Sequence, residues 1–254
     1  KSKALGFIAG FTGQEIEREV REFGCDTDFI KLKNGMSRIN VKIKADVESE
    51  INGGGPDIPE EALEELYEKL NCLTEGDILV LAGSIPKTMP VDIYEKIMES
   101  LQDKGVKFIV DTTGESLLKV LKYEPFLIKP NHHELEEFCK KELSSLEEII
   151  EGARIIQQKG ALNVIVSMGK DGSLLVTKDG GVYRGNVPKG TLRNSVGAGD
   201  SMVAGIVSKL AVEEDLLTAY KYGISSGSAT AFSYDLCTET EVLTLLNEII
   251  ISKI

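Results

Sequence analysis

The sequence predicts an α/β protein built on a mostly parallel β-sheet, with helices on both faces and a small β lid. Three observations lead to this fold class. Short apolar runs of strand length alternate with segments of helical period from about residue 78 onward. Residues 29–50 instead alternate apolar and polar side chains. The 254 residues suffice for one large domain or two small ones, and we expect one domain over 1–254 with the lid at about 29–52.

The alternating part of the chain supplies the sheet and its covering helices. Strands are expected over residues 78–82, 106–110, 126–128 and 163–167, and helices over 91–104, 117–121 and 146–159. A strand–helix–strand order is typical of parallel strands, because the helix carries the chain back to the edge where the next strand begins. The main sheet is therefore expected to be buried on both faces.

Two regions depart from this alternation of strands and helices. Residues 39–45 read INVKIKA, and this period of two predicts a half-exposed antiparallel strand in a β flap. Residues 173–184 hold Asp179-Gly180-Gly181 between two β-prone runs, which indicates a hairpin. After residue 199 the pattern is helical almost to the end of the sequence.

Charge and cysteine usage limit the classes of partner. The net charge of −12 disfavours nucleic acid and anionic membrane surfaces as partners. The four cysteines are scattered without a CxxC pair, as in a cytoplasmic protein with reduced thiols. No apolar run approaches the roughly 20 residues that span a bilayer. If the ligands are phosphates, the site must be locally positive.

The segment 194–201, which reads NSVGAGDS, is the strongest functional signal. Its small residues let backbone N–H groups converge, and the apolar pattern after it marks the start of a helix. A helix N-terminus with free amides favours phosphate. Asp200 could then take a proton from an attacking hydroxyl. The alternative is structural, because Asp is a common helix N-cap and such turns occur without ligands.

Three further segments follow predicted strands, where open α/β sheets bind their ligands. The run 129–134 reads KPNHHE and offers Asn131 and Glu134 as oxygen ligands for Mg²⁺, or simply a turn and a first helical turn. Residues 167–172 read SMGKDG and fit either a nucleotide or a hairpin turn. Residues 82–86 read AGSIP and place Ser84 either on a substrate phosphate or in a plain loop.

Two surface features complete the candidates. Arg38, on the flap, could bind a phosphate through paired hydrogen bonds or remain an ordinary surface arginine. The acidic run 59–69 is expected to be a solvated helix face with i,i+4 pairs such as Glu65 and Lys69. Because four of the candidate segments follow strands of one sheet, one crevice could hold them together.

In this order, the AGS turn, KPNHHE, SMGKDG and GAGDS resemble the PfkB (ribokinase-like) sugar kinases over essentially the whole chain. Within that family, three stretches are most similar to bacterial 1-phosphofructokinases: SRINVKI at 37–43, NGGGP at 52–56 and GSATAFS at 227–233. The resemblance implies a three-layer α/β/α sandwich with a mostly parallel central sheet and a β lid over the sugar. It also implies ATP-dependent phosphorylation of fructose 1-phosphate to fructose 1,6-bisphosphate.

The resemblance assigns a role to each motif. Asp200 would be the base that deprotonates the acceptor hydroxyl, and the amides of Gly197, Ala198 and Gly199 would form an anion hole. Lys129 would approach the ATP phosphates. The nucleotide would be held by a set of residues from the SMGKDG turn: Ser167, Met168, Gly169, Lys170, Asp171 and Gly172.

Further roles follow from the same resemblance. Asn131 and Glu134 would organise Mg²⁺ through water, and Arg38 and Ser84 would hold the phosphate already on the sugar. The helical residues Ser225 and Ser228 would border the adenine pocket. Some relatives also hold a monovalent cation near the anion hole; its neighbours here would be Asn194, Val196, Thr230 and Ser233.

The sequence departs from the family pattern at its start. Family members begin with a strand bearing a sugar-binding Asp, followed by a GGxGxN segment, whereas this sequence opens at residues that resemble the family's second strand. We therefore expect a segment upstream, and expect the sequence as written to bind sugar poorly.

Alternatives remain at the level of function and assembly. A tagatose-6-phosphate kinase of the same family would use nearly the same chemistry. A catalytically inactive sugar-phosphate or nucleotide sensor that kept the fold is the alternative from another class. Lid strands in this family often pair between subunits, and the alternating flap has one apolar face that needs cover, so a homodimer is expected.

Overall fold

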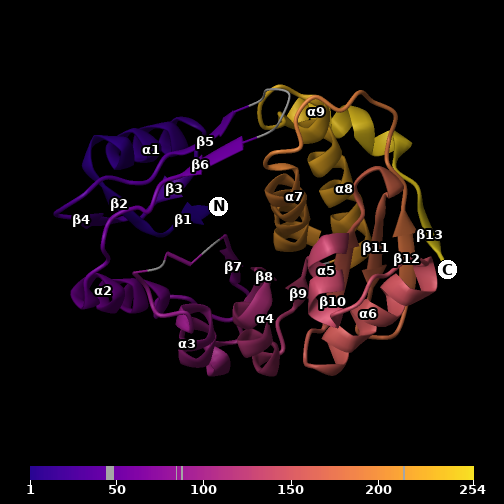
Figure 1. Cartoon of the computed structure of the whole chain (residues 1–254), viewed down its shortest axis with the longest axis horizontal. Helices are drawn as coiled ribbons and strands as arrows, with labels where there is room; N and C mark the ends of the chain where they lie inside the picture. Colours follow the sequence, from indigo (N-terminus) through magenta and orange to yellow (C-terminus); the bar gives the residue numbers. More distant parts are fainter. Residues whose placement is uncertain (44–48, 84, 87, 214) are drawn as a thin grey trace. The chain divides into compact units, whose positions relative to one another are not determined.

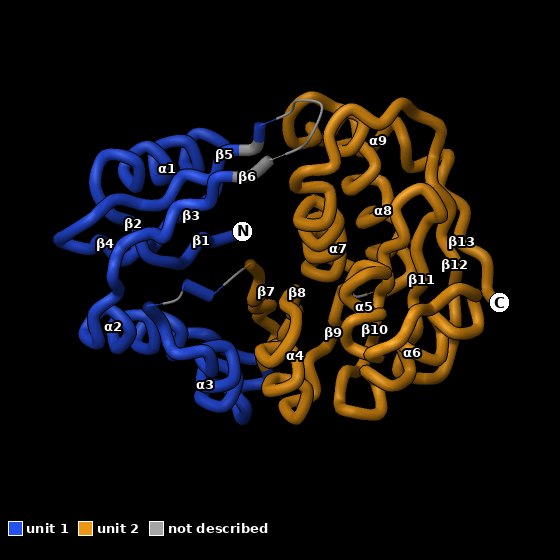
Figure 2. The backbone as a smooth tube through the Cα atoms, viewed as in Figure 1, with its two compact units in different colours: residues 1–75, 84–105 blue, residues 76–83, 106–254 orange. Residues whose placement is uncertain are grey.

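The structure is a computed structural model that describes residues 1–43, 49–83, 85–86, 88–213 and 215–254. The chain forms two compact units (Figure 2). Unit 1 comprises residues 1–75 and 84–105, and unit 2 comprises residues 76–83 and 106–254. In the described residues, no helix is both long and apolar enough to cross a membrane.

Unit 1 contains short strand pairs and three α-helices. β1 pairs in parallel with β3, β2 pairs in parallel with β4, and β5 and β6 form an antiparallel ribbon. The ribbon confirms the β flap that the alternating pattern predicts. The elements are β1 (Lys3–Ala4), β2 (Phe7–Ala9), α1 (Gly10–Glu22), β3 (Asp26–Thr27), β4 (Ile30–Leu32), β5 (Asn40–Ile43), β6 (Ser49–Asn52), α2 (Glu60–Leu70), α3 (Ile93–Ser100) and η1 (Gln102–Lys104).

Unit 2 is built on one sheet of seven strands, in the order β13-β12-β11-β10-β9-β8-β7 (Figure 1). The strands are β7 (Ile78–Ala82), β8 (Lys107–Asp111), β9 (Leu127–Ile128), β10 (Asn163–Ser167), β11 (Ser173–Val176), β12 (Val182–Gly185) and β13 (Ile251–Lys253). β7 to β10 are mutually parallel, and β11 to β13 extend the sheet by antiparallel pairing. The sheet is therefore mixed, and its parallel part is the part that the strand–helix alternation predicts.

Helices cover both faces of this sheet. They are α4 (Gly114–Val120), η2 (Leu121–Tyr123), α5 (His132–Cys139), α6 (Leu146–Gln158), η3 (Gly169–Asp171), α7 (Ala198–Glu213), α8 (Leu216–Phe232), α9 (Glu239–Leu245) and η4 (Leu246–Glu248). α7 and α8 pack side by side on one face (Figure 1). α5 and α6 contact β10. Successive residues of β10 point to opposite faces of the sheet, and residues 163–166 are all buried, so both faces are covered here. This is the arrangement of an α/β/α sandwich.

The core beneath α7 and α8 explains why these helices are apolar almost all round. Strand residues with the same pleat direction meet the two helices in one buried cluster, which includes Ile109, Leu127, Ile165, Leu175, Met202, Val203, Ile206, Tyr220 and Ile224. The helices also lie very close to each other. A Cβ built on Gly223 would lie 2.5 Å from Ile206 Cγ1, so only glycine allows this approach.

The sequence-predicted boundaries hold to within one residue for the four parallel strands and shift further for two of the helices. The strands over 78–82 and 163–167 have the bounds that the apolar runs predict, and the 173–184 hairpin is confirmed as β11 and β12. The expected helix 91–104 ends at Ser100 and continues as η1, and the helix expected at 117–121 begins at Gly114. β13 is not predicted, because its three residues form a strand only by pairing with β12.

Core packing in α7 can be tested with one substitution type at two positions. Val203→Ala should lower the free energy of unfolding by about 2 kcal/mol, because this side chain is 4% exposed in the core. Val212→Ala on the same helix should change it by less than about 0.5 kcal/mol, because Val212 is 76% exposed. Urea-induced unfolding measures both, and equal losses would contradict the assigned packing.

Candidate active site

The candidate motifs of unit 2 meet at the carboxyl ends of its parallel strands. β8 ends at Asp111, Lys129 follows β9, and β10 ends at Ser167. Asn131 and Ser167 form an isolated parallel bridge beyond the two strands, and the Ser167 amide donates to the Pro130 carbonyl at 3.0 Å. The ladder between β9 and β10 thus continues into both motifs and holds them side by side.

Lys129 is the centre of this group. The residue is 5% exposed, and its Nζ lies 3.2 Å from Asp111 Oδ2. Removing an ammonium from water is unfavourable unless a partner compensates, and Asp111 supplies the compensating charge. Sequence reasoning missed Asp111. The available signal was a carboxylate directly after the apolar run Phe108-Ile109-Val110, at the end of a predicted strand.

The electrostatic surroundings of Asp111 include the other candidate acids. Burial raises the pKa of the Asp111 carboxyl above its usual range, and the adjacent Lys129 ammonium opposes this increase through its charge and a hydrogen bond. The negative charges of Glu134 and Asp200 raise the pKa of Asp111 further. Three carboxylates therefore act on a site that contains one buried ammonium, and a bound phosphate would require additional cations.

The head of α7 brings backbone amides to the same place. Gly197 adopts φ of +77°, in the left-handed region, and the Ser201 amide donates to its carbonyl at 2.8 Å. Within the described part of the chain, the amides of Gly199 and Asp200 have no hydrogen-bond acceptor. Free amides at a helix N-terminus are suited to an anion.

Gly199 lies directly against Lys129. A Cβ built on Gly199 would lie 3.3 Å from Lys129 Nζ, so a side chain at this position would crowd the ammonium. Of the sequence-predicted residues of this turn, Gly199 is brought beside Lys129, and Asp200 is near enough to Asp111 to raise the pKa of its carboxyl. The Ala198 amide donates to the Ser195 carbonyl at 3.3 Å and is not free. An ammonium and uncommitted amides together can stabilise negative charge that develops on a transferred phosphoryl group.

Asn131 and Glu134 form the capping box of α5. Asn131 Oδ1 accepts from the Glu134 amide at 2.9 Å, and Glu134 Oε2 accepts from the Asn131 amide at 2.7 Å. The turn and first helical turn that the sequence offered as the alternative to a metal site are therefore present. The second carboxylate oxygen, Glu134 Oε1, is not used by the capping box and can make a further contact. The capping box fixes the direction of this carboxylate near Asp111.

The acidic residues of the site fit a hydrated divalent metal rather than a directly chelated one. In the part of the chain that the structure describes, no three His, Cys, Asp or Glu side chains converge closely enough to hold a metal ion. Mg²⁺ keeps several waters and is usually bound by one or two carboxylates together with substrate phosphates. Asp111 and Glu134 supply the hard oxygen donors for such an arrangement.

The SMGKDG segment forms the tight turn η3 between β10 and β11. The Met168 amide donates to the Gly172 carbonyl at 2.9 Å. Gly172 has φ of +91°, and a Cβ there would lie 2.2 Å from the Gly185 carbonyl oxygen. Lys170 and Asp171 are exposed at the tip of the turn. The hairpin-turn alternative is therefore present, and nucleotide contact by this turn remains a prediction.

The serines predicted at the adenine pocket lie on α8. Ser225 is fully buried, and its hydroxyl donates to the Val242 carbonyl in α9 at 2.6 Å. Ser228, farther along the same helix, is half-buried. The hydroxyl of Ser225 is thus committed inside the protein, where it joins α8 to α9.

The structure assigns neither of the two residues predicted to hold the sugar phosphate to the group around Lys129. Arg38 is exposed in unit 1, between β4 and β5. Ser84 lies outside the described residues. Their participation remains a prediction.

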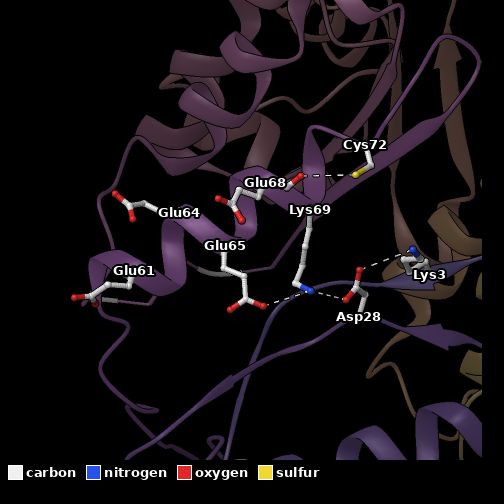
Figure 3. Close-up of a pocket in the computed structure, with 8 residues that line it drawn as sticks. All are labelled: Lys3, Asp28, Glu61, Glu64, Glu65, Glu68, Lys69 and Cys72. Atoms are coloured by element: carbon white, nitrogen blue, oxygen red, sulfur yellow. Dashed lines mark hydrogen bonds and ion pairs between the residues drawn. The ribbon is translucent and has the colours of Figure 1, made fainter.

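A separate hollow in unit 1 contains none of the motif residues. Its wall is the acidic face of α2, together with Lys3 and Asp28 (Figure 3). Lys69 points from the helix to Asp28 at 2.6 Å and to Glu65 at 3.3 Å. The i,i+4 pair predicted for Glu65 and Lys69 is confirmed, and Lys69 links two of the carboxylates that line this charged hollow.

Comparison with known proteins establishes the family. Residues 1–242 match the pfkB family carbohydrate kinase profile. The chain belongs to the pfkB family of carbohydrate kinases. PfkB relatives include a 1-phosphofructokinase of Bacillus subtilis, 48% identical over 253 residues that make up 100% of this chain and 83% of the relative. A D-tagatose-1-phosphate kinase of Bacillus licheniformis is 37% identical, with coverage of 92% of this chain and 76% of the relative.

Solved structures agree with the pfkB assignment and confirm the ribokinase-like sandwich. A Staphylococcus aureus protein described as a phosphofructokinase superposes with a TM-score of 0.90 at 36% identity, covering 100% of this chain and 82% of that one. Phosphofructokinase-2 of Escherichia coli in complex with potassium superposes with a TM-score of 0.88 at 26% identity, covering 96% and 81%.

The role of the buried ammonium is testable. Lys129→Met should lower kcat about 10²–10³-fold, because it removes the charge beside the Gly199 amide and leaves Asp111 buried without its partner. Steady-state kinetics of ADP release measures this. Lys178→Met, at an exposed lysine of the β11–β12 hairpin, should retain the parental rate. A Lys129→Met variant with unchanged kcat would exclude the ammonium from the chemistry.

Proposed function

We propose that this pfkB kinase transfers the γ-phosphoryl group of ATP to fructose 1-phosphate, giving fructose 1,6-bisphosphate and ADP. The observation that carries the proposal is the approach of the head of α7, which bears free amides and Asp200, to the buried pair of Lys129 and Asp111. The choice of sugar is supported by the B. subtilis relative, named a 1-phosphofructokinase, at 48% identity.

The proposed transfer begins at the C6 hydroxyl of the sugar. Asp200 accepts the hydroxyl proton while the oxygen attacks the γ-phosphorus, and the bond from that phosphorus to the β–γ bridging oxygen breaks. ADP leaves with the bridging oxygen. The amides of Gly197 and Gly199 and the Lys129 ammonium stabilise the charge on the transferred group. The Ala198 amide, which donates to the Ser195 carbonyl at 3.3 Å, would have to leave that acceptor to join them.

Cations compensate the excess of carboxylates. Mg²⁺ supplies charge neutralisation of the ATP phosphates, and Asp111, Asn131 and Glu134 would hold its water shell. A monovalent cation near Asn194, Val196, Thr230 and Ser233 is supported by the E. coli relative, which was crystallised in complex with potassium. Of these neighbours, Thr230 would contribute through its backbone, because its hydroxyl is hydrogen-bonded to Ser201 and Cys237.

The remaining substrate contacts are proposed from the motifs. The turn from Ser167 to Gly172 would carry the nucleotide, with Ser225 and Ser228 on the helix behind the adenine. Arg38 and Ser84 would bind the phosphate that the sugar already carries.

A second sugar is favoured by a specific observation. The B. licheniformis relative at 37% identity is named a D-tagatose-1-phosphate kinase. That sugar differs from the one expected as an alternative from the sequence, tagatose 6-phosphate, in the position of its phosphate. The ketose 1-phosphates share the phosphate position and differ at one hydroxyl, so a few contacts decide between them.

The proposed catalytic base, Asp200, can be tested by substitution. Asp200→Asn should lower kcat about 10²–10⁴-fold while ATP affinity stays within about twofold, because the amide cannot take the proton. A coupled assay for ADP measures the rate, and calorimetry measures the affinity. Asp103→Asn, at an exposed position in η1, is the matched control and should keep the parental rate.

The same assay decides the substrate. We expect ADP formation only when a sugar phosphate is present, with kcat/KM highest for fructose 1-phosphate among the 1- and 6-phosphates of fructose and tagatose. If Asp200→Asn kept the parental kcat, Asp200 would not be the catalytic base. ATP binding without turnover in the parental protein would favour the sensor alternative.

We further propose that a second copy of the chain covers the flap. Four exposed apolar side chains (Ile39, Val41, Ile43 and Ile51) lie on one face of the β5–β6 ribbon, where Val41 is directly opposite Ile51. A two-stranded ribbon is marginally stable without cover on its apolar face. A symmetric partner that presents the same face would supply it.

Sedimentation tests the dimer. The parental protein should sediment as a dimer, and Val41→Lys should sediment as a monomer, because a charge in the covered face is desolvated. Val212→Lys, at an exposed apolar position in α7, should leave the dimer intact. A parental monomer at micromolar concentration, or a Val41→Lys dimer of unchanged stability, would refute this interface.

A further inference from the structure

Thr230, near the end of α8, makes two hydrogen bonds that reach the head of α7. The residue is 1% exposed. Its hydroxyl donates to Ser201 Oγ at 2.8 Å and accepts from the Cys237 amide at 3.0 Å. Ser201 directly follows Asp200, and Cys237 ends the loop 233–237 that connects α8 to α9. One buried hydroxyl therefore joins that loop to the turn that carries the candidate base.

We infer that Thr230 is a positioning residue for phosphoryl transfer. It touches no reacting atom. By holding Ser201, it sets the direction of the first turn of α7, and with it the Gly199 amide and the Asp200 carboxylate. The inference rests on the proposed function of that turn, and it gives Thr230, which the sequence indicated only as a neighbour of a monovalent cation, a role in positioning the base.

The packing contacts around the turn have no preferred direction, so the Thr230 hydroxyl makes the contacts that fix its orientation. A Cβ on Gly227 would lie 3.0 Å from the Ala198 carbonyl oxygen, so α8 presses on the turn from one side. The Leu236 side chain also borders the turn, and its Cδ2 is 2.9 Å from a Cβ built on Gly197. These apolar and steric contacts limit how close the elements come. The two hydrogen bonds define their rotation and register, because such bonds weaken steeply when misaligned.

Loss of the hydroxyl would act on catalysis rather than on packing. Valine has nearly the shape of threonine, so Thr230→Val keeps the space filled and leaves the Cys237 amide without its acceptor and Ser201 Oγ without its donor. The freed loop and turn can then shift. A misplacement of about 1 Å in a catalytic group can cost about 10²-fold in rate.

The kinetic test separates positioning from binding. Thr230→Val should lower kcat at least about tenfold and leave KM for ATP and for fructose 1-phosphate within about twofold, because the lost contacts act in the transition state. Thr230→Ser restores the hydroxyl and should recover kcat to within about threefold of the parental value. Parental kcat in Thr230→Val would overturn the inference.

Tyr220→Phe is the matched control on the same helix. Tyr220 is fully buried, and its hydroxyl lies 2.7 Å from Ser173 Oγ, in the part of the core away from the head of α7. This variant also loses a buried hydrogen bond, so its Tm should fall by an amount comparable to that of Thr230→Val, while kcat stays within about twofold. Equal losses of kcat in both variants would assign the effect to general stability and refute a positioning role.

Hydrogen exchange distinguishes this inference from the proposed function. Without any sugar, Thr230→Val should accelerate deuterium uptake in the peptide 195–205, and Thr230→Ser and Tyr220→Phe should not. Unchanged uptake in Thr230→Val would overturn the positioning role whatever the substrate. If the parental protein did not turn over fructose 1-phosphate, the proposed function would fail, and the uptake pattern alone would decide on Thr230.

Discussion

The ion pair between Lys129 and Asp111 is the interaction on which the site depends. A buried ammonium is stable here only because a carboxylate lies 3.2 Å away at the end of the neighbouring strand. Two parallel strands, β8 and β9, bring these side chains together, since their carboxyl ends share one edge of the sheet. The pair in turn places a fixed positive charge against Gly199, where the head of α7 presents free amides.

Close packing transmits this arrangement to the rest of unit 2. α7 rests on the sheet through apolar side chains, and α8 rests on α7 through glycines that allow near contact of the two backbones. The head of α7 is consequently held from three directions: by the sheet, by α8 and by the loop 233–237. Preorganisation of this kind lets amides and charges stabilise a developing charge without reorganising during the reaction.

Local sequence reasoning recovered the parallel strands, the flap and the hairpin. It did so because apolar runs and turn glycines report on a residue's own backbone. It missed Asp111, β13 and the contacts of Thr230. Each depends on a partner far along the chain: Lys129 for Asp111, β12 for β13, and Ser201 for Thr230. The double role of Asn131 and Glu134, as cap and as candidate metal neighbours, was visible as two alternatives that residue types alone do not separate.

The sequence by itself determined the fold class, the family and the candidate segments for chemistry, because periodicity and short motifs are properties of consecutive residues. Only the tertiary structure decided which side chains share one environment. Burial, the compensating charge beside Lys129 and the orientation of the α7 turn arise from long-range contacts. Desolvation and Coulomb interaction depend on distance in space, and no pattern along the chain encodes that distance directly.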